Sequence, residues 1–103
     1  MEKVRRDGLV AVLCSPGFGC GWYSWNSKYP ELLFDPEIVQ AVEDKKGLAW
    51  IEALVLRKYP GAFLGGLAEV EIVWLPQGSV FEIVEYNGAE TIYFPGSRQQ
   101  FIA

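Results

Sequence analysis

The apolar positions of the chain fall into stretches that predict one strand, two helices and three further strands, in that order. Residues 9–14 read LVAVLC, and an unbroken apolar run of this length is typical of a central strand covered on both faces. Residues 69–75 alternate between polar and apolar positions, and residues 80–86 and 90–94 flank a turn signal. The pattern predicts an α+β fold, β-α-α-β-β-β, in which two helices pack on one face of an antiparallel sheet.

Two helices are expected in the middle of the chain. Asp35 is a good N-cap, Pro36 follows at the first helical position, and Gly47 ends this helix. A second helix is predicted over residues 48–59, and Pro60 follows it. Because apolar residues lie on most sides of the second helix, we expect it to be well buried.

Two turns set the expected registers of the last three strands. Asn87–Gly88 is a strong signal for a two-residue hairpin turn, which places Glu85 opposite Glu90. A loop at residues 76–78 is expected to join the two preceding strands as a second hairpin. The two hairpins gather four glutamates at one end of the sheet: Glu69, Glu71, Glu85 and Glu90. This cluster is interpreted as a solvated acidic edge, as an oxygen-ligand site for Mg²⁺ or Ca²⁺, or as a site for sugar hydroxyls or a partner's basic residues.

The stretch that carries most information about function is residues 14–26, CSPGFGCGWYSWN. It predicts a glycine-rich loop with aromatic residues directly after a buried strand, and loops on rigid scaffolds commonly carry binding sites. The loop matches neither the dinucleotide-binding nor the P-loop motif. Glycine backbone N–H groups can bind an anion, and Trp22 and Trp25 can stack on a planar base. The alternative is that the glycines permit a tight turn and the tryptophans fill the core. The candidate ligand-binding residues are Gly17, Phe18, Gly19, Gly21, Trp22, Trp25, Asn26, Lys28, Glu85 and Glu90.

Length and charge narrow the classes of function. The 103 residues suffice for one domain, 1–103, in which residues 95–103 form a C-terminal tail. The net charge of −4 argues against general nucleic-acid binding, and no apolar run is long enough to span a membrane. We expect a cytoplasmic protein without a cofactor. A homodimer or higher homo-oligomer, formed through a strand edge, is left open.

The chain contains no histidine, which excludes a Ser-His-Asp triad, a Cys-His dyad and any His-ligated zinc site. Ser15, Cys14 and Cys20 have no activating base in the sequence around them. No catalytic residue is therefore predicted, and a non-enzymatic function is favoured. In a cytosolic chain we expect two free thiols rather than a disulfide.

Four segments resemble a family of small phage-encoded proteins: SPGFGCGWYSWN, LLFDPEIVQAVE, KYPGAFLGG and FEIVEYNGAETI. The resemblance covers nearly the whole chain, and its most specific parts are the patterns SPGFGxGWxxWN and FxIxEYxGxE. That family is uncharacterised, so it assigns no activity or site residue to this chain. The resemblance implies an accessory phage protein that acts in the host cytoplasm.

Three functions follow as hypotheses. The first is a counter-defence protein that sequesters a nucleotide-derived immune signal: Trp22 and Trp25 stack on the base, the glycine loop binds phosphate, and Asn26 and Lys28 add polar contacts. The second is an inhibitor or adaptor that binds a host protein through the same loop. The third is a metal-dependent hydrolase that uses the two facing glutamates of the last hairpin, for which no motif was found.

Overall fold

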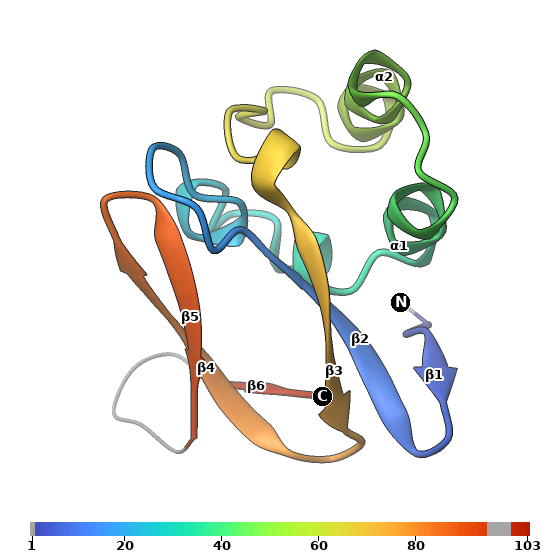
Figure 1. Cartoon of the computed structure of the whole chain (residues 1–103), viewed down its shortest axis with the longest axis vertical. Helices are drawn as coiled ribbons and strands as arrows, with labels where there is room; N and C mark the ends of the chain where they lie inside the picture. The colour runs from blue at the N-terminus through green and yellow to red at the C-terminus, as the bar shows by residue number, and fades with distance from the viewer. Residues whose placement is uncertain (1, 95–99) are drawn as a thin grey trace.

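Two α-helices and two three-stranded antiparallel sheets form the structure, a computed structural model that describes residues 2–94 and 100–103 (Figure 1). The α+β class and the order of a strand, two helices and further strands are confirmed. Short 3₁₀ segments, labelled η, connect several elements. In chain order the elements are β1 (Arg5–Arg6), β2 (Leu9–Cys14), η1 (Tyr23–Trp25), η2 (Pro30–Leu33), α1 (Pro36–Glu43), α2 (Leu48–Lys58), η3 (Leu67–Glu69), β3 (Glu71–Pro76), β4 (Val80–Tyr86), β5 (Ala89–Tyr93) and β6 (Gln100–Ile102).

The first sheet has the order β1-β2-β3, with β2 in the centre. Val12 of β2 lies opposite Val73 of β3, and β1 pairs along the other edge. Because all residues from Val10 to Cys14 are buried, the prediction of a central strand covered on both faces is confirmed. Asp7 and Gly8 join β1 to β2 with φ angles of 52° and 78°, as a two-residue hairpin turn requires.

The second sheet has the order β5-β4-β6. Asn87 and Gly88 form the predicted turn between β4 and β5, with φ angles of 49° and 85°, and Glu85 pairs with Glu90 as expected. The predicted tail at residues 95–103 lies partly outside the described residues. Its last part forms β6, which pairs with β4 so that Phe81 lies opposite Phe101.

The strands that follow α2 are divided between two sheets, whereas the sequence predicted one. The expected hairpin between β3 and β4 is wrong, because β3 pairs with β2 and belongs to the other sheet. The connection instead bonds to distant segments: Gln77 N–H donates to the Gly8 carbonyl, and Gly78 N–H donates to the Ala103 carbonyl. The four-glutamate cluster is therefore wrong as well, since its members lie on two sheets and on η3.

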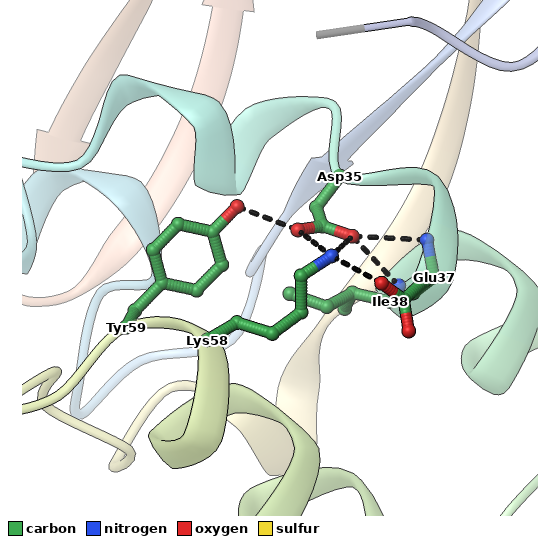
Figure 2. A network of polar contacts seen from close by, with 5 residues as sticks. All are labelled: Asp35, Glu37, Ile38, Lys58 and Tyr59. Carbon is green, nitrogen blue, oxygen red and sulfur yellow. Dashed lines mark hydrogen bonds and ion pairs between the residues drawn. The ribbon is translucent and has the colours of Figure 1, made fainter.

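Asp35 fixes the start of α1 and also connects α1 to α2 (Figure 2). Its carboxylate accepts the Glu37 and Ile38 N–H groups, which confirms the predicted N-cap. Although Asp35 is fully buried, it also accepts the Tyr59 hydroxyl at 2.5 Å and pairs with the Lys58 ammonium at 2.8 Å. Burial, and then the hydrogen bond to Asp35, raise the pKa of the Tyr59 phenol. This network holds the end of α2 against the start of α1.

The two helices are attached to the first sheet through α1, which contacts β3, while α2 contacts α1 and η3 (Figure 1). One face of α2 is buried through Ile51, Leu54 and Val55. The expectation of a helix buried on most sides is wrong, because Trp50 and Leu56 are 52% and 44% exposed. Neither helix in the described part of the chain is long and apolar enough to cross a membrane.

Candidate functional site

The glycine-rich loop between β2 and η1 lies beside the tip of the β4–β5 hairpin (Figure 1). Gly19 N–H donates to the Asn87 carbonyl at 2.7 Å. A Cβ atom at Gly88 would lie 2.6 Å from the backbone of Gly19 and Cys20, so the contact is between two backbones with no room for a side chain. The loop and the hairpin tip therefore form one surface.

Glu90 fastens the base of this loop from the inside. Its carboxylate accepts three hydrogen bonds, from Ser15 N–H at 3.0 Å, Ser24 N–H at 2.8 Å and Ser24 Oγ–H at 2.7 Å. Glu90 N–H in turn donates to the Ser15 carbonyl. Glu90 is only 3% exposed. Its carboxylate therefore acts as an internal clamp on both ends of the loop.

Asn26 and Trp22 are also used internally. The Trp22 indole is fully buried and donates to the Leu32 carbonyl at 2.9 Å. Asn26 donates to the carbonyls of Trp22 and Phe63 and accepts Phe63 N–H at 2.7 Å. These bonds join the glycine loop to the segment after α2. They occupy the side-chain N–H₂ and carbonyl groups of Asn26 within the protein.

The ten candidate residues thus separate into two groups. Trp22, Asn26 and Glu90 are buried, so the ligand contacts expected of them do not fit this structure: a fully buried indole has no free face for stacking. Gly17 and Gly21 are at least partly buried as well. The exposed candidates are Phe18, Gly19, Trp25, Lys28 and Glu85.

Four exposed aromatic side chains surround the loop, and we call them the aromatic ridge: Phe18, Trp25, Phe63 and Tyr86. Their exposed fractions are 74%, 43%, 46% and 71%. Phe18 and Tyr86 meet edge to face, with ring centres 6.5 Å apart, and the rings of Trp25 and Phe63 are 5.3 Å apart. Cys20 lies beside the Trp25–Phe63 pair, because a Cβ at Gly65 would lie within 3 Å of both its sulfur and the Phe63 ring.

Three exposed glutamates lie near the loop, two by its base and one by the hairpin tip, and we call them the acidic rim: Glu69, Glu71 and Glu85. Glu69 packs against Gly17, Glu71 pairs with Cys14 at the end of β2, and Glu85 accepts Gly88 N–H at 2.7 Å. Burial, followed by the charges of Glu90 and Glu71, raises the pKa of the Cys14 thiol to about 11. The thiol is therefore protonated at neutral pH and is a poor nucleophile.

Three surface hollows lie away from this loop. Hollows of about 380 and 250 Å³ flank α2, and one of about 230 Å³ lies between Lys3 and Phe34; no residue of the loop lines them. The described residues contain no cluster of three or more acidic or cysteine side chains that could hold a metal ion. Both cysteines are free thiols. The exposed aromatic rings of the loop surface can make apolar contacts.

Tyr86 and Phe63 belong to the ridge but were not among the candidate residues. A signal for Tyr86 existed, since it directly precedes the Asn87–Gly88 turn and the tip of a hairpin is exposed. Phe63 comes next to the loop through the bonds that Asn26 makes and through its ring contact with Trp25.

Fold and site together define an α+β protein with an exposed aromatic surface around a glycine-rich loop. No protein-family model, no curated protein and no solved structure matches the chain.

Proposed function

We propose that the protein is a small non-enzymatic binding protein that docks onto another protein through the aromatic ridge. The observation that carries the proposal is the exposure of Phe18 and Tyr86, each above 70%, in contact with one another. Contiguous exposed apolar patches of this kind mark interaction sites, and aromatic residues are enriched at the centres of protein interfaces.

The rigidity of the surface supports the proposal further. Phe18 lies on a loop whose two ends are held by the buried Glu90 and whose tip is bonded to Asn87. Trp25 lies on η1 and contacts Phe63, which Asn26 holds in place. A surface that is ordered before binding loses less conformational entropy on docking, so more of its contact energy appears as affinity.

The acidic rim indicates the chemistry of the partner. Glu69, Glu71 and Glu85 are exposed near the loop that carries Phe18, and the chain carries a net charge of −4. The complementary surface has apolar side chains at its centre with lysine or arginine around them, and such charges steer the encounter. If the resemblance to small phage proteins holds, this partner is a protein of the host cytoplasm, and the chain acts as an inhibitor or adaptor.

Sequestration of a nucleotide-derived signal is the second candidate. The observation that favours it is the exposure of Trp25 in the glycine-rich loop segment, because an exposed indole can stack on a planar base. Four of the residues first assigned to the ligand are buried, Gly21, Trp22, Asn26 and Glu90, and none of the three hollows described above is lined by the loop. We therefore rank it below protein docking. No observation favours a metal-dependent hydrolase.

Two measurements separate these candidates. Affinity capture from host lysate compares the native chain with the Phe18→Ser, Trp25→Ala double variant and with Trp50→Ala, which changes an exposed tryptophan far from the loop. A partner that is held by the native chain and by Trp50→Ala, and is lost with the double variant, supports docking. Quenching of tryptophan fluorescence by cyclic nucleotides or ADP-ribose derivatives, abolished by Trp25→Ala, would instead support sequestration.

A further inference from the structure

The strand β3 pairs with β2 along one edge, and along its other edge it pairs with no strand of the described chain (Figure 1). Ala11 N–H donates a hydrogen bond on the β1 side of β2. Backbone groups of successive residues in a strand point to alternate sides, so Val12 turns its N–H and carbonyl towards Val73 of β3. The backbone groups of Ile72 and Trp74, on either side of Val73, therefore point away from β2.

These outward backbone groups have no hydrogen-bond partner within residues 2–94 and 100–103. An unpaired strand edge can pair with another chain, and natural proteins commonly protect such an edge with charged residues or proline. β3 carries this protection only at its ends, in Glu71 and Pro76, and the residues between them read IVWL. The middle of this edge is therefore open to a further strand.

We infer that two copies of the chain pair through β3, with the two strands antiparallel and a two-fold axis passing at Val73. This register places Ile72 of each copy opposite Trp74 of the other, so that each unpaired N–H meets an unpaired carbonyl. Because the axis relates the two edges, the same bonds form on both sides of it. The first sheets of the two copies then form one continuous sheet.

The ends of the edge agree with the same register. Pro76 has no N–H, and its carbonyl accepts Ser79 N–H at 3.1 Å. The register places Pro76 opposite Val70 of the second copy, and Val70 N–H already donates to the Leu67 carbonyl at 3.2 Å. Neither end of the pairing therefore presents a donor that lacks an acceptor.

The side chains along the edge are complementary as well. Ile72 of each copy lies beside Trp74 of the other, and the two Val73 side chains meet at the axis. Pairs of β-branched and aromatic residues are favourable cross-strand neighbours, and all three residues are only half-buried in one copy. Glu71 lies opposite Leu75, so no like charges face each other directly.

This inference does not depend on the proposed function, because no residue of the aromatic ridge lies on β3. It assigns the strand-edge homodimer that the sequence left open to one strand. A dimer of this form carries two ridges, so it binds a repeated or dimeric partner with higher avidity than one copy does. The Phe18→Ser, Trp25→Ala double variant should keep the dimer mass, so a failure of docking and a failure of pairing are distinguishable.

Analytical ultracentrifugation of the full chain tests the inference. We expect a species of twice the 11.6 kDa of one chain. Ile72→Pro removes an outward N–H that the pairing with β2 does not use, and edge strands tolerate proline at such a position. It should weaken dimerisation at least about a hundredfold, since the bond is lost on both sides of the axis. Ile72→Val is the matched control, because it keeps the N–H and the β-branched shape and should remain a dimer.

A pair of surface substitutions tests the register without risk to folding. Gln77 is exposed and lies beyond Leu75, diagonally across from Glu71 of the second copy. Gln77→Lys should strengthen dimerisation and Gln77→Glu should weaken it, each roughly fivefold. This pair decides the question if Ile72→Pro fails to fold by circular dichroism. Equal effects of the two charges would overturn the inference.

A covalent test completes the design. Val73→Cys in a Cys20→Ser background should form an intermolecular disulfide on mild oxidation, since the two-fold axis brings the two side chains together. Thr91→Cys in the same background is the control, because it is exposed on the second sheet and should stay reduced for longer. A native chain that is monomeric at the highest attainable concentration, or a folded Ile72→Pro variant that remains a dimer, would contradict the pairing.

Discussion

The Glu90 carboxylate accepts hydrogen bonds from both the backbone N–H and the hydroxyl of Ser24, at 2.8 and 2.7 Å. A third bond from Ser15 N–H comes from the other end of the glycine-rich loop. One buried side chain of the second sheet thus determines the path of a loop that leaves the first sheet. The exposed aromatic ridge depends on this internal clamp for its shape.

Replacing Glu90 should therefore destabilise the protein and loosen the loop. Glu90→Gln removes the charge and turns an N–H₂ group towards N–H donors, which we expect to lower the free energy of unfolding by about 2–3 kcal/mol. Urea denaturation measures the change. Glu85→Gln is the matched control, because Glu85 is exposed and accepts only Gly88 N–H among the described residues; its effect should be below about 1 kcal/mol. Equal effects of the two substitutions would contradict the clamp.

The contact between Gly88 and the loop can be tested with a pair of glycines. Gly88 and Gly78 have nearly the same φ angles, +85° and +86°, but only Gly88 would place a Cβ 2.6 Å from backbone atoms. Gly78→Ala should cost about 1–2 kcal/mol, the price of a left-handed alanine. Gly88→Ala adds a clash with Gly19 and Cys20, so we expect about 3 kcal/mol or more. If Gly78→Ala and Gly88→Ala lost similar stability in urea, the loop would be able to move away from a side chain at position 88.

The two tryptophans of the loop should respond very differently to substitution. Trp22→Phe removes buried volume and leaves the Leu32 carbonyl without its donor, and should lower the free energy of unfolding by about 2–4 kcal/mol. Trp25→Phe changes a side chain that is 43% exposed and should cost less than about 1 kcal/mol. Thermal or urea unfolding measures both. If Trp22→Phe lowered the free energy of unfolding as little as Trp25→Phe, the indole of Trp22 would not be part of the core.

Stability should fall in alkaline solution. The folded chain raises the pKa of the Cys14 thiol from 9.0 to about 11, so the folded state holds this proton more tightly than the unfolded state. The protonated Cys14 thiol contributes to the free energy of unfolding. This contribution is fully present below about pH 9 and is lost as the pH rises to about 11, an effect on the order of 2 kcal/mol. The raised pKa of the Tyr59 phenol acts in the same direction above about pH 10. Urea denaturation from pH 8 to 11 should show this decline.

The variant Cys14→Ala isolates the thiol. Its stability is expected to be lower at pH 8, because a small buried side chain is shortened, but to decline less steeply between pH 9 and 11. A native chain whose stability is constant across this range would mean that Cys14 is solvated in the folded state.

Local patterns predicted the elements well. The apolar run of β2, the Asp35 cap and the Asn87–Gly88 turn each act within a few residues, and each is found where it was expected. The division into two sheets was not predictable in this way, because it depends on which distant strand meets β3. A strand of alternating polarity pairs equally well with β2 or β4 as far as its own sequence shows.

The sequence predicted the position of the candidate site but not the role of each residue in it. The sequence located the glycine loop, yet Trp22 and Trp25 look alike in it, and only the tertiary structure buries the first and exposes the second. Glu90 was predicted as a ligand-binding member of an acidic cluster. Its role as an internal acceptor depends on Ser15 and Ser24, which lie 66 or more positions away along the chain.

Site-specific photocrosslinking tests the central claim, that the aromatic ridge is a docking surface, most directly. A photoreactive phenylalanine analogue is placed at Phe18 in one chain and at Leu48, an exposed residue of α2, in another, and both are irradiated in host cells. The account predicts one dominant heterologous adduct from position 18, reduced roughly 30-fold by Trp25→Ala, and no adduct with the same protein from position 48. The same heterologous adduct from both positions, or an adduct at position 18 that does not depend on Trp25, would contradict it.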